Sequence, residues 1–146
     1  MLRLSEAAHA AILAHAYDGL PNEACGLLVG SLADATAPRF EPCRNAAESS
    51  RVYTVDSRDH FRVYRQTEDE GTDIVGVVHS HTHTEAYPSP TDVEQAPDPE
   101  WHYVIVSLRQ EAPVMRSYRI VDGSITEETI QVEPMEVEPM QVDASL

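Results

Sequence analysis

The stretch from residue 79 to residue 92 contains the side chains with the clearest chemical potential. His79 and His81 are spaced i, i+2, and Ser89 and Asp92 follow after seven intervening residues. Extended backbone points residues i and i+2 to the same side, so both imidazoles can reach one metal ion. Two imidazoles and one carboxylate are the usual protein ligands of a catalytic zinc that keeps one position open for water. The pattern therefore predicts a hydrolytic zinc site, with Glu23 as the candidate proton carrier.

Ser89 and Asp92 also have a purely structural interpretation. The sequence Ser-Pro-Thr-Asp is typical of a helix start, with Ser89 as N-cap, Pro90 at the first helical position and an acid three residues after the cap. Considered alone, this pattern favours a capping arrangement. Because His-x-His precedes it at this distance, the same rigid helix start would also present Asp92 to the metal.

Other polar residues near this stretch have less definite roles. His83 continues the i, i+2 register, so a third imidazole ligand is conceivable, although a loop position near the cleft mouth is the favoured interpretation. A structural or surface role is expected for His102. Asn45 and Tyr53 fall where substrate-facing residues could lie, but the sequence does not place them.

Charge and composition exclude several classes of function. The chain has 146 residues, with ten arginines, no lysine and 25 acids, for a formal net charge of −15. Such acidity opposes binding to nucleic-acid phosphates. No apolar run is long enough for a membrane span, and no signal-peptide pattern begins the chain, which favours a cytoplasmic protein. Cys25 and Cys43 are expected to be reduced, buried thiols.

The order of elements indicates an α/β domain around a mixed β-sheet flanked by helices. Apolar runs predict strands at residues 25–29, 40–44, 52–55, 74–79 and 101–108. Helices are expected at residues 6–17, capped by Ser5, and at about 57–68, capped by Asp56 or Ser57. An Asp-Gly turn at 122–123 predicts a hairpin whose second strand covers 124–132. Residues 1–132 would form this domain, and the acidic, proline-containing residues 133–146 a flexible tail.

These motifs together resemble the JAMM (MPN-plus) zinc metalloprotease family. The resemblance rests on His-x-His, seven residues, Ser-x-x-Asp, with an upstream Glu23 before a Gly-x-Leu-x-Gly strand. Further similarity at residues 21–26, 84–89, 102–107 and 116–123 is to the compact bacterial branch, particularly actinobacterial Mec-type sulfur-carrier hydrolases. It covers residues 1–131 and implies a single JAB1/MPN-like, cytidine-deaminase-like fold.

The resemblance also implies a role for each motif residue. His79, His81 and Asp92 would bind one zinc ion per chain, with water in the fourth position. Glu23 would take the proton of that water and later protonate the leaving amine, and Ser89 would stabilise the oxyanion.

The reaction implied by the resemblance is cleavage after the terminal Gly-Gly of a small ubiquitin-like sulfur-carrier protein, releasing cysteine in cysteine biosynthesis. One alternative is an isopeptidase that removes ubiquitin-like modifiers from protein lysines, and another is a non-catalytic MPN scaffold. A zinc nucleobase deaminase is disfavoured, since its His-x-Glu and Pro-Cys-x-x-Cys motifs do not occur. Small relatives often dimerise, so a homodimer stays open.

Overall fold

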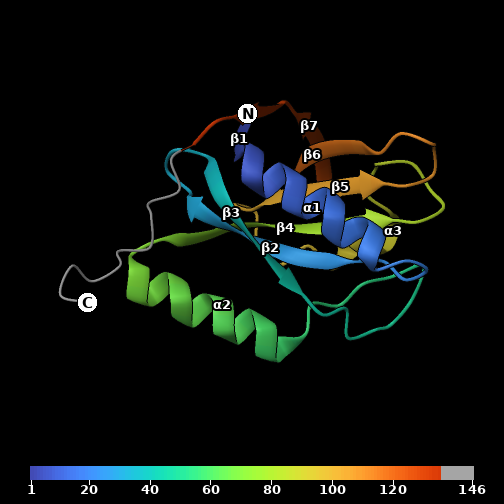
Figure 1. Cartoon of the computed structure of the whole chain (residues 1–146), viewed down its shortest axis with the longest axis horizontal. Helices are drawn as coiled ribbons and strands as arrows, with labels where there is room; N and C mark the ends of the chain where they lie inside the picture. Colours follow the sequence, from blue (N-terminus) through green and yellow to red (C-terminus); the bar gives the residue numbers. More distant parts are fainter. Residues whose placement is uncertain (136–146) are drawn as a thin grey trace, which may run out of the picture.

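A computed structural model describes residues 1–135 of the chain, with one sheet and three helices (Figure 1). The elements in chain order are β1 (Leu2–Ser5), α1 (Glu6–Asp18), β2 (Cys25–Ser31), β3 (Thr36–Cys43), α2 (Ser57–Glu70), β4 (Asp73–His81), α3 (Pro90–Glu94), β5 (His102–Ser107), β6 (Val114–Val121), β7 (Ser124–Glu128) and β8 (Ile130–Glu133).

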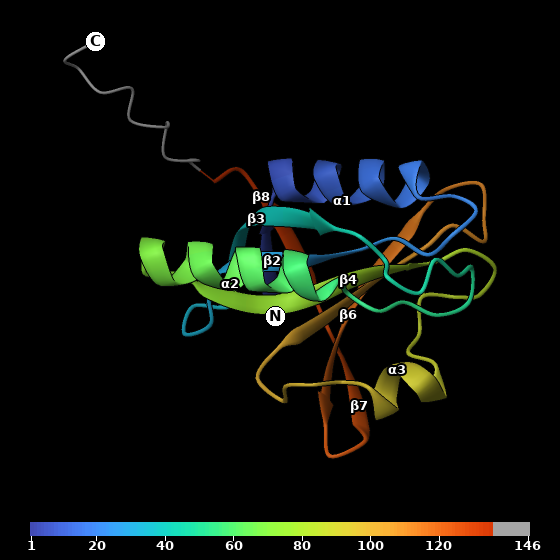
Figure 2. The same ribbon diagram turned by 90° about the horizontal axis from the view of Figure 1, so that it is seen from below.

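Helices lie on both faces of an eight-stranded sheet with the order β7-β6-β5-β4-β2-β3-β1-β8 (Figure 2). The sheet is mixed, because β4 runs parallel to β5 while β2 runs antiparallel to both β3 and β4. Ile12 of α1 belongs to the core on one face, and Val63 of α2 to the core on the other. The predicted α/β domain with a mixed sheet and flanking helices is confirmed.

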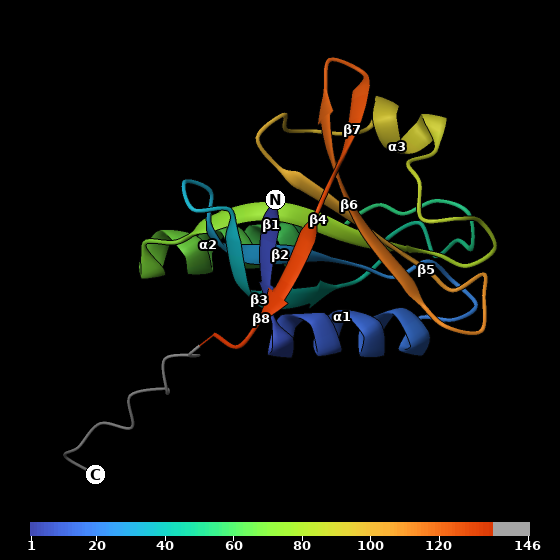
Figure 3. The ribbon, with the colours of Figure 1, turned by 90° about the horizontal axis from the view of Figure 1, so that it is seen from above.

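The two edges of the sheet meet near Thr129. β7 and β8 are separated by this one residue, yet they occupy opposite ends of the strand order, so the twisted sheet must curl back on itself (Figure 3). The prediction of one hairpin strand over 124–132 is therefore wrong beyond Glu128. Residues 130–133 leave the hairpin and pair in parallel with β1.

Two further strand predictions need correction. Residues 52–55 form no strand; only an isolated bridge joins Asn45 to Val55. The strand expected at 40–44 begins earlier, at Thr36, because its first half pairs with β1 as well as with β2. β1 was not predicted, although its alternating Leu2 and Leu4 are both completely buried.

The helices begin where their capping residues indicate. Ser5 Oγ accepts a hydrogen bond from the Ala8 amide at 2.9 Å, and Asp56 caps α2 in the same way. α2 continues to Glu70, past its predicted end at about 68. It stops at Gly71, which adopts the left-handed φ of 70°.

The last predicted segment is described only at its start. Glu133 is the final residue of β8 and forms an ion pair with Arg3, while residues 136–146 lie outside the described part of the chain. The division of the chain after residue 132 stays a prediction. Within residues 1–135, no helix is long and apolar enough to cross a membrane.

Candidate metal and catalytic site

His79 and His81 lie at the carboxyl end of β4, with both side chains on the face that carries α2 and α3. Each residue is only 3% exposed. The strand register places His79 between Cys25 of β2 and Ile105 of β5, and His81 beside Ser107. A buried central strand thus fixes both imidazoles, as the i, i+2 spacing predicts.

α3 brings Asp92 to the two imidazoles. Ser89 Oγ accepts a hydrogen bond from the Asp92 amide at 3.1 Å, and the Ser89 amide donates one to Asp92 Oδ2 at 2.9 Å. The capping box expected from the sequence is therefore present. It holds the Asp92 carboxylate in one orientation, with Oδ2 turned toward the end of β4.

Three potential ligand atoms converge at this point. His79 Nε2 and His81 Nε2 are 3.0 Å apart, and Asp92 Oδ2 lies 3.2 and 3.1 Å from them. Tetrahedral zinc with bonds of roughly 2.0–2.1 Å would separate its ligand atoms by about 3.3 Å. The triangle therefore has the size that one zinc ion requires.

The chemistry of the donor atoms agrees with this geometry. His81 Nδ1 lies 2.7 Å from the Glu85 carbonyl oxygen, which can only accept, so Nδ1 carries the proton and neutral His81 has its lone pair on Nε2. That lone pair faces the carboxylate of Asp92. Two acceptor atoms this close, both buried, are stable only with a cation or a proton between them.

Burial and mutual contact set the ionisation of these ligands. Burial lowers the pKa of His79, which favours the neutral, metal-binding form. Burial also acts to lower the pKa of His81, but the Asp92 carboxylate and the Glu85 carbonyl outweigh it and raise that pKa. Burial would raise the pKa of Asp92, yet the two histidines hold it well below its ordinary value. The centre of the triangle thus favours positive charge.

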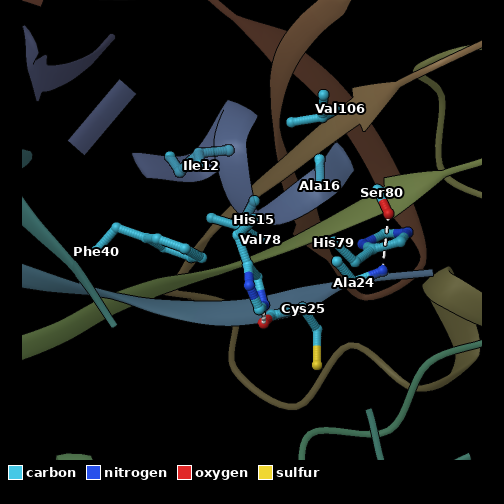
Figure 4. A pocket seen from close by; sticks show the side chains of 10 residues that line it. All are labelled: Ile12, His15, Ala16, Ala24, Cys25, Phe40, Val78, His79, Ser80 and Val106. Atoms are coloured by element: carbon cyan, nitrogen blue, oxygen red, sulfur yellow. Dashed lines mark hydrogen bonds between the residues drawn. The ribbon is translucent and has the colours of Figure 1, made fainter. Parts of the chain in front are cut away.

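Glu23 precedes β2 and is brought beside His81 by the sheet register. Cys25 pairs with His79 in antiparallel register, so Glu23, two residues earlier, lies opposite His81. Figure 4 shows the adjoining contact, in which the Ala24 amide donates to Ser80 Oγ at 2.8 Å. The Ser80 amide returns a hydrogen bond to the Ala24 carbonyl at 2.9 Å. These two bonds anchor the residue next to Glu23 on β4.

The Glu23 side chain is itself left without a partner. It is 5% exposed, and its Oε1 makes no hydrogen bond to any residue in the described part of the chain. Burial raises the pKa of Glu23 to about 7, with His81 opposing the shift and Asp92 adding to it. A buried carboxyl group that can gain or release a proton near neutral pH suits a general base.

The segment of residues 45–55 contacts both His79 and Glu23. Tyr53 stacks on His79, with ring centroids 4.2 Å apart and an angle of 16° between the planes. Asn45 Nδ2 donates to the Glu23 carbonyl at 3.0 Å. The sequence singled out both residues but not these contacts, because neither residue has a neighbouring motif that reveals its partner.

The remaining predicted residues lie apart from the three ligand atoms. His83 is exposed and does not belong to the cluster formed by His79, His81 and Asp92. His102 is 2% exposed and its Nδ1 lies 2.6 Å from Glu128 Oε2, so the expected structural role is confirmed. Cys25 and Cys43 are both buried and free, although they face each other across β2 and β3.

Comparison with known proteins gives consistent results. The family described as prokaryotic homologs of the JAB domain matches residues 5–121. The CysO-cysteine peptidase of Mycobacterium tuberculosis is 46% identical over 123 residues, which are 84% of each chain. The desampylase of Haloferax volcanii is 38% identical, over 72% of this chain and 81% of its own. A solution structure from Desulfitobacterium hafniense has a TM-score of 0.84 at 33% identity, covering 92% of this chain and 94% of the other.

Proposed function

Because this chain belongs to the family of prokaryotic JAB-domain homologs, we propose that it is a JAMM-type zinc metallopeptidase. Its substrate in this proposal is a small ubiquitin-like sulfur-carrier protein extended by cysteine after a terminal Gly-Gly. Hydrolysis of that amide would release cysteine for biosynthesis. The similarity to a CysO-cysteine peptidase over 84% of both chains supports this substrate class.

One observation carries the proposal. Three lone-pair-bearing atoms, from His79, His81 and Asp92, surround one point, and a buried carboxyl group without a partner lies beside them. Zinc bound there would act as a Lewis acid and lower the pKa of a water ligand from 15.7 toward about 7. The described residues satisfy this group only in part: the Ser89 amide donates to Asp92 Oδ2, but Glu23 Oε1 has no donor and the lone pair of neutral His81 faces a carboxylate.

The chain's own groups account for the proton transfers. Glu23 Oε1 would accept a proton from the attacking water and then donate it to the amide nitrogen that leaves. Hydrolysis thereby converts one amide and one water into a carboxyl group and an amine. Ser89 Oγ, which accepts from the Asp92 amide, keeps its own hydroxyl proton free to donate to the developing oxyanion. The one serine can thus cap α3 and stabilise negative charge together.

The compartment and the assembly are also proposals. Free thiols at Cys25 and Cys43, opposite each other on neighbouring strands, are consistent with the reducing cytoplasm. The homodimer stays a prediction. An isopeptidase acting on protein lysines has the same chemistry and differs only in the leaving amine, so it enters the test as the second candidate.

The test measures metal content and cleavage in the same preparation. We expect about one zinc per chain and release of cysteine from a carrier extended after Gly-Gly. Glu23→Gln should lower turnover by roughly 10²–10⁴-fold and retain the metal, because only the proton carrier is lost. Glu127→Gln, at an exposed carboxylate that contacts Arg116, is the matched control and should cleave normally.

Three outcomes would contradict the proposal. A protein that binds no zinc at neutral pH lacks the proposed cofactor. Full activity of Glu23→Gln removes Glu23 as the base. Faster cleavage of a lysine isopeptide than of the cysteine-extended carrier would assign the isopeptidase activity instead.

A further inference from the structure

We propose that the 45–55 segment is the positioning element of the site, with Tyr53 setting the plane of the His79 imidazole and Asn45 fixing the backbone of Glu23. This inference rests on the proposed function. Tyr53 would act on metal binding through His79, which we call the metal side, and Asn45 would act on proton transfer through Glu23, which we call the proton-transfer side. Neither would touch the reacting atoms, and both would act through the residue they contact.

The 45–55 segment is closed on itself without being a strand pair. The Ala46 amide donates to the Thr54 carbonyl at 2.8 Å, next to the bridge between Asn45 and Val55. Asn45 Oδ1 accepts from the amides of Ala47 and Thr54, each at 3.0 Å. One side chain thus holds both arms of the loop in a single conformation.

The amide nitrogen of Asn45 links the 45–55 segment to Glu23. Asn45 Nδ2 donates to the Glu23 carbonyl at 3.0 Å and, within the segment, to the Val52 carbonyl at 3.1 Å. The Glu23 amide in turn donates to the Ser49 carbonyl at 2.8 Å. Both backbone polar groups of Glu23 are therefore held by the 45–55 segment, and this fixes the direction in which its unpartnered side chain leaves the backbone.

The two histidines are oriented by different means. Metal-binding histidines almost always donate their second ring N–H to an acceptor, and His81 does so to the Glu85 carbonyl. Within residues 1–135, no such hydrogen bond is made by Nδ1 of His79. The face of Tyr53 lies on its ring instead, 4.2 Å away and nearly parallel. Stacking restricts the tilt of the imidazole, which a hydrogen bond would otherwise control.

A third contact ties the segment to the end of β4. Thr82 Oγ1 donates to the Ser50 carbonyl at 3.0 Å, and Thr82 directly follows His81. The loop thus contacts the backbone of Glu23, the ring face of His79 and the side chain of Thr82. A loop that only covered the core would not need all three of these contacts with the site.

Variants at Tyr53 test the metal side. We expect Tyr53→Leu to weaken zinc affinity by about 10–100-fold, the usual effect of losing a residue that orients a ligand. Tyr53→Phe keeps the ring and should bind zinc like the native protein. Affinity is measured by competition with a chromophoric chelator, and cobalt substitution reports the ligand field by its absorption bands. Tyr64→Leu, at an exposed tyrosine of α2, is the matched control.

Variants at Asn45 test the proton-transfer side. Asn45→Asp keeps the acceptor oxygen but loses the donors to the Glu23 and Val52 carbonyls. We expect unchanged zinc affinity and at least about a 10-fold loss of turnover at saturating zinc, as misplacement of a catalytic group produces. Gln110→Glu, the same change of amide to carboxylate at an exposed position, should leave both quantities unchanged.

The two sides can fail separately. Native zinc affinity and a native cobalt spectrum in Tyr53→Leu would overturn the role of Tyr53, and native turnover in Asn45→Asp would overturn that of Asn45. If Tyr53→Leu does not fold, as judged from its thermal transition, Tyr53→Met replaces it as the variant without an aromatic face. If the native protein binds zinc but does not cleave the carrier, the proposed function fails, whereas the zinc affinities still decide the role of Tyr53.

Discussion

Two buried histidine–carboxylate groups occupy opposite faces of the same sheet, and they are built differently. The His102 cluster consists of His102, Ser117 and Glu128. His102 Nδ1 and Ser117 Oγ lie 2.6 and 2.8 Å from Glu128 Oε2, so each donor meets an acceptor. The metal site of His79, His81 and Asp92 instead directs three acceptor-capable atoms at one point. Similar residues therefore serve different purposes, according to whether donors and acceptors are matched.

The pattern of hydrogen bonds is thus more informative than burial or residue type. Both groups are almost inaccessible to solvent, and both combine imidazole with carboxylate. In the His102 cluster Glu128 Oε2 meets two donors, and Glu128 Oε1, which makes no hydrogen bond within the described residues, still lies 3.4 Å from the charged amino group of Met1. A ligand site instead holds buried polar atoms that need a partner from outside the chain, and Glu23 Oε1 is a further atom of this kind. Four predictions can break or sharpen this distinction.

The largest effect is expected from His81→Ala. Loss of one of three ligand atoms should abolish stoichiometric zinc binding and with it all detectable cleavage, because the remaining pair cannot hold the ion. Native protein should also gain thermal stability when zinc is added, and the variant should not. The metal content of purified protein and its melting temperature with and without zinc provide the measurements. His102→Ala should keep the zinc; its loss there would show that the two clusters are not independent.

Ser89→Ala and Ser117→Ala compare one serine from each group. Ser89→Ala should lower turnover by roughly 10²–10³-fold with zinc retained, by analogy with other oxyanion donors. Ser117→Ala should leave turnover unchanged and lower stability by about 1.5 kcal/mol, the lower end of the range for a hydrogen bond to a charged group. Steady-state kinetics at saturating zinc and denaturant unfolding measure the two effects. Equal kinetics for both variants would mean that Ser89 only caps α3.

Glu128→Gln tests the structural cluster alone. Removing the charge that His102 and Ser117 contact should lower the free energy of unfolding by about 2 kcal/mol, since hydrogen bonds to charged groups are worth roughly 1.5–3 kcal/mol. Cleavage by the folded variant should remain native. Urea titrations of both proteins check the first expectation. A variant as stable as the native protein would show that the cluster contributes nothing to the fold.

The smallest effect is expected in the pH dependence of the stability difference between the native protein and Glu128→Gln. Burial acts to raise the pKa of Glu128, but His102 and Ser117 outweigh it and hold the pKa below the ordinary 4.5. Ionised Glu128 therefore stabilises the fold fully above pH 4.5, and this stabilisation is lost as the pH falls through the lower pKa of the folded state. The stability difference between native protein and Glu128→Gln should be constant near neutral pH and shrink in acid. A difference that grows in acid would reverse the assigned sign.

The strand ends at the sheet edges show where local patterns fail. Residues 130–132 are predicted from the sequence as the end of a hairpin strand, but they pair with β1, which is more than a hundred residues away in the sequence. Residues 52–55 have strand-like composition, yet they form no strand. Tyr53 stacks on His79, and the Asn45 side chain holds the loop by accepting the Thr54 amide. In both places tertiary contacts override β-propensity, which depends on what a strand packs against.

The sequence by itself determined the ligand set and the local geometry that presents it. The i, i+2 histidines belong to one strand, and Ser89 and Asp92 to one helix start, so their arrangement follows from the backbone over a few residues. The family resemblance named Glu23 as the proton carrier, but only the tertiary structure placed its carboxyl group beside them. The register of β2 against β4 brings Glu23 to His81, and the fold of the 45–55 segment brings Tyr53 to His79. Such pairings depend on the packing of both sheet faces, because no local pattern records which distant residue will be opposite.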